Sequence, residues 1–211
     1  MRTSEGTDTS AASAIARPYA KYRPNMRVVA GTARGRRLVT PPGTDVRPTT
    51  DRVREAVFNA LGSLGAIEGG RVLDLFAGSG ALGIEALSRG ASHATFVERD
   101  RRAQAAIEAN VATTGLADRA SIVVCDAVQA LERTADQFDL VLLDPPYAFA
   151  DWAGLLDRLD QRTSAGAVIV AESDRAVDAP EWGELVRAKT YGSTVVTLVR
   201  RTPSIPSEPC P

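Results

Sequence analysis

Apolar and polar residues alternate in a regular rhythm from about residue 70 onwards. Short apolar runs, each typical of a buried strand, are separated by stretches in which apolar residues recur at helical spacing. Apolar strands that alternate with amphipathic helices predict a parallel sheet with helices on both faces, an α/β fold of the doubly wound, Rossmann-like type. The expected strands cover residues 71–76, 93–98, 120–126, 138–144 and 167–172, and the expected helices cover residues 80–90, 99–115, 127–134 and 149–159.

A hairpin and a helix are expected before this alternation starts. Residues 26–31 and 36–41 are short β-like runs joined by Thr-Ala-Arg-Gly, which predicts a small hairpin. Over residues 51–63 apolar side chains return at helical spacing, and the polar residues 49–51 are candidate N-caps. The α/β domain is therefore expected to carry a small N-terminal extension.

A second hairpin is expected near the C-terminus. Residues 184–189 and 194–200 are β-rich, and the turn between them falls at residues 191–193. The two chain ends lack such patterns: the first is rich in Ser, Thr, Ala and Gly, and the last is punctuated by proline. We expect a disordered leader at 1–25, a hairpin arm at 26–50, the α/β domain at 51–201 and a flexible tail at 202–211.

Composition limits the class of protein. The chain has 211 residues, of which 44% are apolar, enough for one domain with a hydrophobic core. No apolar run approaches the ~20 residues of a membrane-spanning helix, and the N-terminus lacks the apolar stretch of a secretory signal. The two cysteines, Cys125 and Cys210, form neither a disulfide framework nor a zinc pattern. These features predict a cytoplasmic protein without a membrane segment or a metal site.

Charge is distributed unevenly, although the formal net charge is only −1. Residues 21–60 carry nine basic and three acidic side chains, whereas residues 61–211 carry 14 basic and 21 acidic ones. A basic segment on an acidic body is typical of a protein that meets a polyanion, although an ordinary solvated basic surface has the same composition.

A glycine-rich segment, DLFAGSGALG, runs from Asp74 to Gly83 between an expected strand and an expected helix. Glycines at such a junction allow a tight turn and the close approach of a ligand, and the spacing also occurs in dinucleotide-binding proteins. Glu98, at the end of the next strand, fits a ribose in either case. Asp74 favours S-adenosylmethionine, because a carboxylate repels a pyrophosphate but attracts a cationic amino group. Asp126 is placed to meet an adenine amino group or to cap the next helix, and both roles stay open.

The fourth expected strand ends in Asp144-Pro145-Pro146-Tyr147. A residue before proline is pushed towards extended geometry, so the Asp144 side chain is expected to point outwards. The prolines lack N–H groups but keep their carbonyls, so the segment offers acceptors for the two hydrogens of an exocyclic amine. Tyr147 offers a ring on which a base can stack. The segment therefore predicts a clamp that orients a planar amine for methyl transfer, and the plain alternative is a rigid turn.

Six segments together resemble the RsmD family of bacterial 16S rRNA guanine-N2 methyltransferases. They are MRVVAGTARGRRL, RPTTDRVREAVFNAL, VLDLFAGSGALGIEALSRGA, FVERD, FDLVLLDPPY and YGSTVV, within residues 26–200. The resemblance implies a class I methyltransferase fold and methylation of one guanine in 16S rRNA, within a small ribosomal subunit or an assembly intermediate. It implies S-adenosylmethionine as cofactor, no metal, and a target guanine flipped into the clamp; we expect a monomer.

The site residues expected from the motifs and this resemblance form three groups. The catalytic clamp consists of Asp144, Pro145, Pro146 and Tyr147. The cofactor-binding residues are Thr49, Thr50, Asp74, Phe76, Gly78, Ser79, Gly80, Glu98, Arg99, Asp126 and Ala127. The RNA-binding residues, expected to contact phosphates, are Arg34, Arg36, Arg37, Arg47 and Arg52.

Three other functions share part of this pattern. DNA adenine-N6 methylation uses a similar clamp, but the chain has no extra block of residues for a DNA target-recognition domain. Methylation of a protein glutamine also uses a related clamp, with Asn in place of Asp, but it gives no role to the basic arm. An rRNA-binding assembly factor with a secondary catalytic role is the third alternative.

Overall fold

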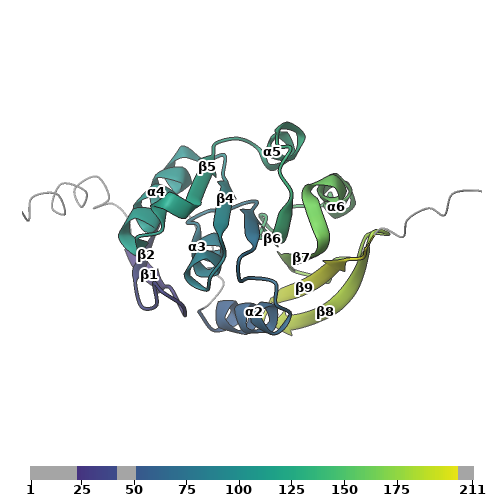
Figure 1. Cartoon of the computed structure of the whole chain (residues 1–211), viewed down its shortest axis with the longest axis horizontal. Helices are drawn as coiled ribbons and strands as arrows, with labels where there is room; N and C mark the ends of the chain where they lie inside the picture. Colours follow the sequence, from purple (N-terminus) through teal and green to yellow (C-terminus); the bar gives the residue numbers. More distant parts are fainter. Residues whose placement is uncertain (1–22, 42–50, 204–211) are drawn as a thin grey trace, which may run out of the picture.

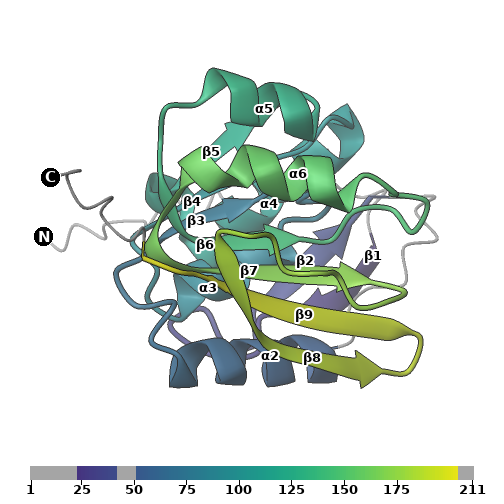
Figure 2. The ribbon, with the colours of Figure 1, turned by 90° about the vertical axis from the view of Figure 1, so that its right-hand side faces the viewer.

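The computed structural model describes residues 23–41 and 51–203, with side chains from Met26 onwards. Within these ranges the chain forms a two-stranded sheet and a seven-stranded sheet (Figures 1 and 2). The seven strands follow the order β5-β4-β3-β6-β7-β9-β8. The expected doubly wound α/β fold, with its antiparallel C-terminal hairpin and small N-terminal hairpin, is confirmed.

The strands of the large sheet lie close to their expected positions. β3 to β7 are parallel, and β9 pairs antiparallel with both β7 and β8. They are β3 (Arg71–Asp74), β4 (His93–Val97), β5 (Ala120–Val123), β6 (Phe138–Leu143), β7 (Thr163–Ser173), β8 (Gly183–Tyr191) and β9 (Thr194–Arg201). β5 ends three residues earlier than expected, and β7 begins four residues earlier than expected.

The helices cover both faces of the sheet. α2, α3 and α4 lie on one face, and α5 and α6 lie on the other (Figure 1). The helices are α2 (Asp51–Ser63), α3 (Ala81–Ser88), α4 (Arg101–Thr114), α5 (Ala127–Arg133) and α6 (Trp152–Leu159), and two 3-10 turns, η1 (Ala117–Arg119) and η2 (Asp160–Arg162), precede β5 and β7. None of these helices is long and apolar enough to cross a membrane.

β6 illustrates how the core is built. Apart from the half-buried Asp139, its residues are buried and apolar on both sides, as expected for a central parallel strand. Leu140 and Leu142 join the core under α2, α3 and α4, while Val141 and Leu143 join the core under α5 and α6. Successive side chains of a strand point to opposite faces, so one apolar run supplies both layers.

The N-terminal hairpin differs from the expectation in its boundaries. β1 (Arg23–Arg27) pairs antiparallel with β2 (Arg37–Thr40). The first strand therefore begins within the expected leader 1–25 and ends before residue 31. Pairing with β2 sets its start, because Arg23 lies opposite Thr40, and the sequence RPNMR has no apolar alternation that would reveal it.

Buried polar side chains of α3 fix this hairpin to the α/β domain. Glu85, whose side chain is fully buried, accepts hydrogen bonds from the backbone N–H groups of Val29 (2.7 Å) and Ala30 (3.0 Å). Ser88 Oγ accepts from the N–H of Ala33 (2.9 Å) and donates to the carbonyl of Ala30 (2.5 Å). Two helix residues thus satisfy the backbone of the loop that joins β1 and β2.

Glu85 also balances two arginines. Arg89 Nε lies 2.7 Å from Glu85 Oε1, and the Nε of the fully buried Arg54 lies 3.6 Å from Oε2. Arg54 in turn donates from Nη2 to the carbonyl of Arg27 at the end of β1 and to Asp51 Oδ1 (2.9 Å). A buried charge is tolerated only when it is paired in this way, so the cluster ties α2, α3 and the hairpin together.

Candidate functional site

Acidic side chains collect at the carboxyl edge of the sheet. Asp74 is the last residue of β3, and Glu98, Asp126 and Asp144 follow the ends of β4, β5 and β6. These four strands are adjacent and parallel, so the four residues share one edge. The chain passes from β3 to β4 on one side, whereas β6 pairs with the other side of β3. Open α/β sheets bind ligands at such a switch point.

The glycine-rich segment forms a tight loop between β3 and α3. Gly78 and Gly80 have φ angles of 55° and 76°, a backbone conformation that glycine adopts without strain. Phe76 has a φ of 136°, which is unusual for a residue with a side chain. At Gly83, an added Cβ would lie 2.4 Å from the ring of Phe96, so glycine is needed for α3 to pack against β4.

Asp74 is buried at the base of this loop. Its Oδ2 accepts a hydrogen bond from the N–H of Gly83 (2.9 Å), in the first turn of α3. Burial raises the pKa of Asp74 to about 7, the Gly83 bond opposes that rise, and the nearby charges of Asp144 and Glu98 add to it. A carboxyl group in this state is stabilised by an added cation, which fits the cationic amino group of S-adenosylmethionine.

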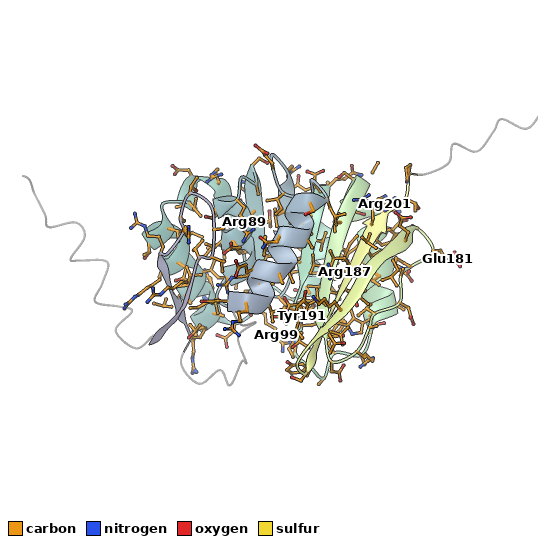
Figure 3. The ribbon with its side chains drawn as sticks, turned by 90° about the horizontal axis from the view of Figure 1, so that it is seen from below. Arg89, Arg99, Glu181, Arg187, Tyr191 and Arg201 are labelled. Atoms are coloured by element: carbon orange, nitrogen blue, oxygen red, sulfur yellow. The ribbon has the colours of Figure 1, made fainter. Side chains whose placement is uncertain are left out.

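Glu98 closes the other side of the loop. Its two oxygens accept hydrogen bonds from the N–H groups of Gly78 (2.9 Å) and Asp100 (2.8 Å). The structure therefore places Glu98 against the glycine loop, where a ligand that enters the loop would meet it. Arg99, the next residue, is exposed at the same edge (Figure 3).

Asp126 performs the simpler of its two expected roles. It is the N-cap of α5, and its Oδ1 accepts from the N–H of Val128 (2.9 Å). The side chain is exposed, and the following Ala127 is buried. A carboxylate that caps a helix with one oxygen has a second oxygen, so the contact with adenine stays a prediction.

The Asp144–Tyr147 segment leaves β6 at the same edge. Asp144 is half-buried, and burial raises its pKa to about 6. Pro145 is buried, whereas Tyr147 is 56% exposed. The N–H of Phe149 donates to the carbonyl of Pro146 (2.8 Å), which turns the chain back towards α6. A half-buried acid and an exposed tyrosine therefore follow β6 at the sheet edge that also carries the glycine loop.

A row of aromatic rings supports this turn. Phe149 makes edge-to-face contacts with Phe76 (5.7 Å between centroids) and with the buried Trp152 of α6 (5.3 Å). The row connects the glycine loop, through Phe76, to the segment after Tyr147. Aromatic contacts of this geometry add stability beyond the area that they bury, so the row fixes the relative position of the loop and the clamp.

The expected RNA-binding residues are only partly described. Arg34, Arg36 and Arg37 are exposed on the hairpin, and Arg52 is exposed in the first turn of α2. Within residues 23–41 and 51–203, none of the four forms an ion pair with an acidic side chain. Arg47 and the expected cofactor-binding residues Thr49 and Thr50 lie outside the described residues.

A residue that the sequence reasoning missed joins the hairpin to the loop. Asn110 of α4 is almost fully buried; its Oδ1 accepts from the N–H of Val39 (2.8 Å) and its Nδ2 donates to the Val39 carbonyl (2.9 Å). The same Nδ2 donates to the carbonyl of Ser79 in the glycine loop (2.8 Å). One side chain thus holds β2 and the loop together.

Glu85 was missed as well, although the sequence carries a signal for it. All eight residues of α3 are buried, and Glu85 is the charged residue among them. A carboxylate in the middle of an apolar helix must find partners, because burying an unpaired charge is costly. Asn110 has no comparable signal, since an asparagine near a helix end is common on surfaces.

A separate cavity lies away from this site, and the described residues contain no candidate metal site. A cavity of about 540 Å³ lies on the α5 face of the sheet, and its walls include Arg71, His93, Phe138 and Cys125 but none of the expected site residues. Across residues 23–41 and 51–203, no group of three or more His, Cys, Asp or Glu side chains is arranged to hold a metal ion.

Comparison with known proteins identifies the family. The family model described as conserved hypothetical protein 95 matches residues 26–200. The Bacillus subtilis protein named "Putative rRNA methyltransferase YlbH" is 45% identical over 83% of this chain and 99% of its own length. The Haemophilus influenzae protein named "Ribosomal RNA small subunit methyltransferase D" is 35% identical over 79% of this chain and 89% of its own length.

A solved structure agrees with these relatives. "Putative methyltransferase yhhF from Escherichia coli" aligns with a TM-score of 0.74 and 37% identity, covering 84% of this chain and 98% of the other. The chain therefore belongs to the conserved hypothetical protein 95 family of RsmD-like proteins and has the fold of S-adenosylmethionine-dependent methyltransferases.

Proposed function

We propose that this methyltransferase transfers a methyl group to the exocyclic N2 of a guanine in 16S rRNA of the small ribosomal subunit. The observation that carries the proposal is that Asp144 and the exposed Tyr147 leave β6 at the same sheet edge as the glycine loop, with Asp144 close enough to influence the pKa of Asp74. The names of the relatives support ribosomal RNA as the substrate. The choice of N2 rests on the family resemblance and on the acceptors of the clamp.

The residues that would hold the cofactor are Asp74, Gly78, Gly80 and Glu98, with Asp126 beside the adenine. Their chemistry fits: the buried carboxyl of Asp74 favours a cation, and Glu98 offers oxygens for ribose hydroxyls. When bound, S-adenosylmethionine supplies an electrophilic methyl group on a sulfonium. The chain's own task is to keep this loop rigid, and the aromatic row and Asn110 serve that purpose.

The clamp acts on the nitrogen of the base. The amine of guanine is a poor nucleophile because its lone pair is delocalised into the ring. Asp144 and the carbonyl of Pro145 accept its two hydrogens, which favours a more tetrahedral nitrogen and orients the lone pair. The raised pKa of Asp144 also suits it to receive the proton that the nitrogen must lose.

Tyr147 and the basic arm bind the rest of the substrate. The Tyr147 ring stacks on the flipped guanine, a contact worth roughly 1–3 kcal/mol. Arg34, Arg36 and Arg37 contact phosphates, and their side chains are exposed on a hairpin that buried anchors hold in place. A base in a loop is already partly unstacked, so flipping it costs less than flipping a paired base.

The test uses small ribosomal subunits from a strain that lacks the corresponding methyltransferase. Labelled S-adenosylmethionine is added with wild-type protein or the Asp144→Ala variant, and the labelled nucleotide is mapped. We expect N2-methylguanine in 16S rRNA with wild type, and a rate reduced about 10²- to 10³-fold with Asp144→Ala. Subunit binding should be largely retained.

Asp157→Ala is the matched control, because it removes an equal charge from an exposed position on α6. It should methylate at the wild-type rate. Label on a ribosomal protein or on an adenine of the rRNA would contradict the proposed substrate. An Asp144→Ala variant that methylates as fast as wild type would contradict the clamp.

A further inference from the structure

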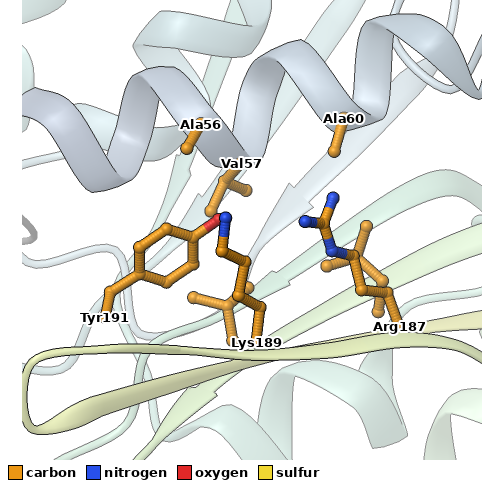
Figure 4. Close-up of a pocket in the computed structure, with 8 residues that line it drawn as sticks. Ala56, Val57, Ala60, Arg187, Lys189 and Tyr191 are labelled. Atoms are coloured by element: carbon orange, nitrogen blue, oxygen red, sulfur yellow. The ribbon is translucent and has the colours of Figure 1, made fainter.

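The C-terminal hairpin carries a basic surface that the proposed function does not yet use. β8 is the edge strand of the large sheet, paired only with β9. Arg187, Lys189 and Tyr191 alternate along it, so their side chains share the face on which α2 lies (Figure 4). We call these three residues the β8 basic strip.

The two cations of the strip have no acidic partner in the described part of the chain. Arg187 and Lys189 are exposed, and neither forms an ion pair there. The Lys189 ammonium lies over the Tyr191 ring, 5.0 Å from its centroid. Two cations without acidic partners therefore lie next to a half-buried tyrosine. Proteins that bind single-stranded nucleic acid combine positive charge with aromatic rings in this way.

Small and apolar side chains of α2 lie opposite the strip. Ala56, Val57 and Ala60 of α2 face the strand, with Tyr191 and Lys189 near Ala56 and Arg187 near Ala60 (Figure 4). The hollow between them is only about 10 Å³, room for about one water molecule. A small-molecule ligand does not fit into this hollow. Any binding partner would therefore contact the exposed side chains of the strip.

The strip leads to the candidate site. β8 runs parallel to β7, since both pair antiparallel with β9, so Tyr191 lies at the carboxyl edge of the sheet. The direction from Arg187 to Tyr191 along β8 also leads towards Arg99, which follows β4 at the carboxyl edge (Figure 3). The N-terminal hairpin lies on the other side of α2 (Figure 1). The two basic surfaces therefore flank α2 on the same face.

We propose that the β8 basic strip is a second contact for the RNA backbone, on the far side of α2 from the N-terminal hairpin. This inference rests on the proposed rRNA function and extends it. Arg187 and Lys189 contact phosphates of a strand that continues past the target base, and Tyr191 packs against the sugar or base between them. The substrate RNA is then held on both sides of the flipped guanine.

A simpler role for these cations is protection of the sheet edge. Charged residues on an edge strand, lysine above all, prevent pairing with a second molecule. That role predicts self-association when the cations are removed and no change in RNA binding. The RNA contact predicts the reverse, so one pair of variants separates them.

The experiment compares wild type with the double variant Arg187→Ala, Lys189→Ala. Binding to unmethylated small subunits and to protein-free 16S rRNA is measured from about 50 to 200 mM salt. We expect the affinity to fall about five- to tenfold at low salt and the slope of log K against log salt to decrease by about 2, one for each phosphate contact. The affinity for S-adenosylmethionine should stay that of wild type.

The double variant Arg133→Ala, Arg158→Ala is the matched control, because it removes the same charge from α5 and α6 on the opposite face. It should leave the slope unchanged.

Two outcomes would overturn the inference. One is self-association of the double variant in sedimentation together with unchanged RNA binding. The other is a loss of affinity confined to assembled subunits, which would indicate that the strip contacts a ribosomal protein. If wild type methylates neither RNA, the proposed function itself fails, whereas equal binding by wild type and variant removes only this inference.

Discussion

The two hairpins of this protein are held in place by different means. The C-terminal hairpin, β8–β9, continues the large sheet, and its position follows from the backbone ladder to β7. The N-terminal hairpin, β1–β2, forms a sheet of its own and is attached through the side chains of Glu85, Ser88 and Asn110. A ladder spreads its stability over many peptide groups, whereas the N-terminal hairpin depends on these polar anchors and on four apolar side chains that join the core, Met26, Val28, Ala33 and Leu38.

The way the N-terminal hairpin is attached matters for the proposed function. The N-terminal hairpin carries the arginines proposed to contact RNA, and its anchors also reach the glycine loop through Asn110. One of its anchors, Asn110, therefore also contacts the proposed cofactor site. Substitutions in the anchors should affect the two hairpins unequally, and the effects can be ranked.

The largest effect is expected for Glu85→Ala. The change removes one of the two carboxylates that pair with the buried Arg54, leaving only Asp51, and it removes the acceptor for the N–H groups of Val29 and Ala30. Losing one partner of a buried ion pair typically costs about 3–5 kcal/mol. Urea unfolding should show this loss, and amide exchange should accelerate in the N-terminal hairpin before β8–β9. Equal acceleration in both hairpins would contradict the contrast.

Asn110→Ala should have the next largest effect. It leaves Val39 and the carbonyl of Ser79 without a buried partner, at a cost of about 2 kcal/mol in the free energy of unfolding. Because Asn110 holds the glycine loop, calorimetry should also show weaker S-adenosylmethionine binding. Thr197→Val is the matched control: it removes one buried hydrogen bond, to Val177, from the C-terminal hairpin. The control should cost about 1 kcal/mol and leave cofactor affinity unchanged.

Three glycines give the finest comparison. Gly31, Gly35 and Gly192 all have positive φ angles, of 83°, 80° and 64°. An added Cβ at Gly31 would lie 1.8 Å from the carbonyl oxygen of Ser88, whereas nothing lies within 4 Å at the other two. We expect alanine to cost about 1 kcal/mol at Gly35 and Gly192, from the backbone alone, and about 2 kcal/mol at Gly31. Three equal midpoint shifts in urea would show that the hairpin moves freely away from α3.

The sequence predicts the parts of the fold that depend on local pattern. α2 begins and ends where its apolar spacing indicated, and β3, β4 and β6 differ from expectation by two residues or fewer. β7 begins at Thr163 rather than at residue 167, because Gly166, with a φ of 79°, and the polar Thr163 and Ser164 interrupt the apolar run without breaking the strand. Pairing with β6 extends the strand where composition does not.

In the candidate site, too, some residues could be predicted from local pattern and others could not. Asp74, Glu98 and Asp144 could be found because each lies in or directly after an apolar strand, and parallel strands bring such ends together. Glu85 and Asn110 lie more than 50 residues from the hairpin atoms that they bind. No local pattern encodes a contact of that kind, which needs the packing of α3 and α4 against β1 and β2. The ambiguity of Asp126 persists because a helix cap and a ligand contact use the same carboxylate.

The two carboxyl groups at this sheet edge, one buried and one half-buried, also affect how many protons the folded protein holds. Asp74 and Asp144 have pKa values of about 7 and about 6, above the ~3.9 of an aspartate in the unfolded chain. The folded protein therefore holds more protons than the unfolded chain between about pH 4 and pH 7, so these groups lower its stability as the pH rises through that range. In the proposed arrangement, a cation beside Asp74 lowers its pKa again. Loading the cofactor near neutral pH should then expel a proton, and cofactor occupancy should fall when the surrounding medium becomes acidic.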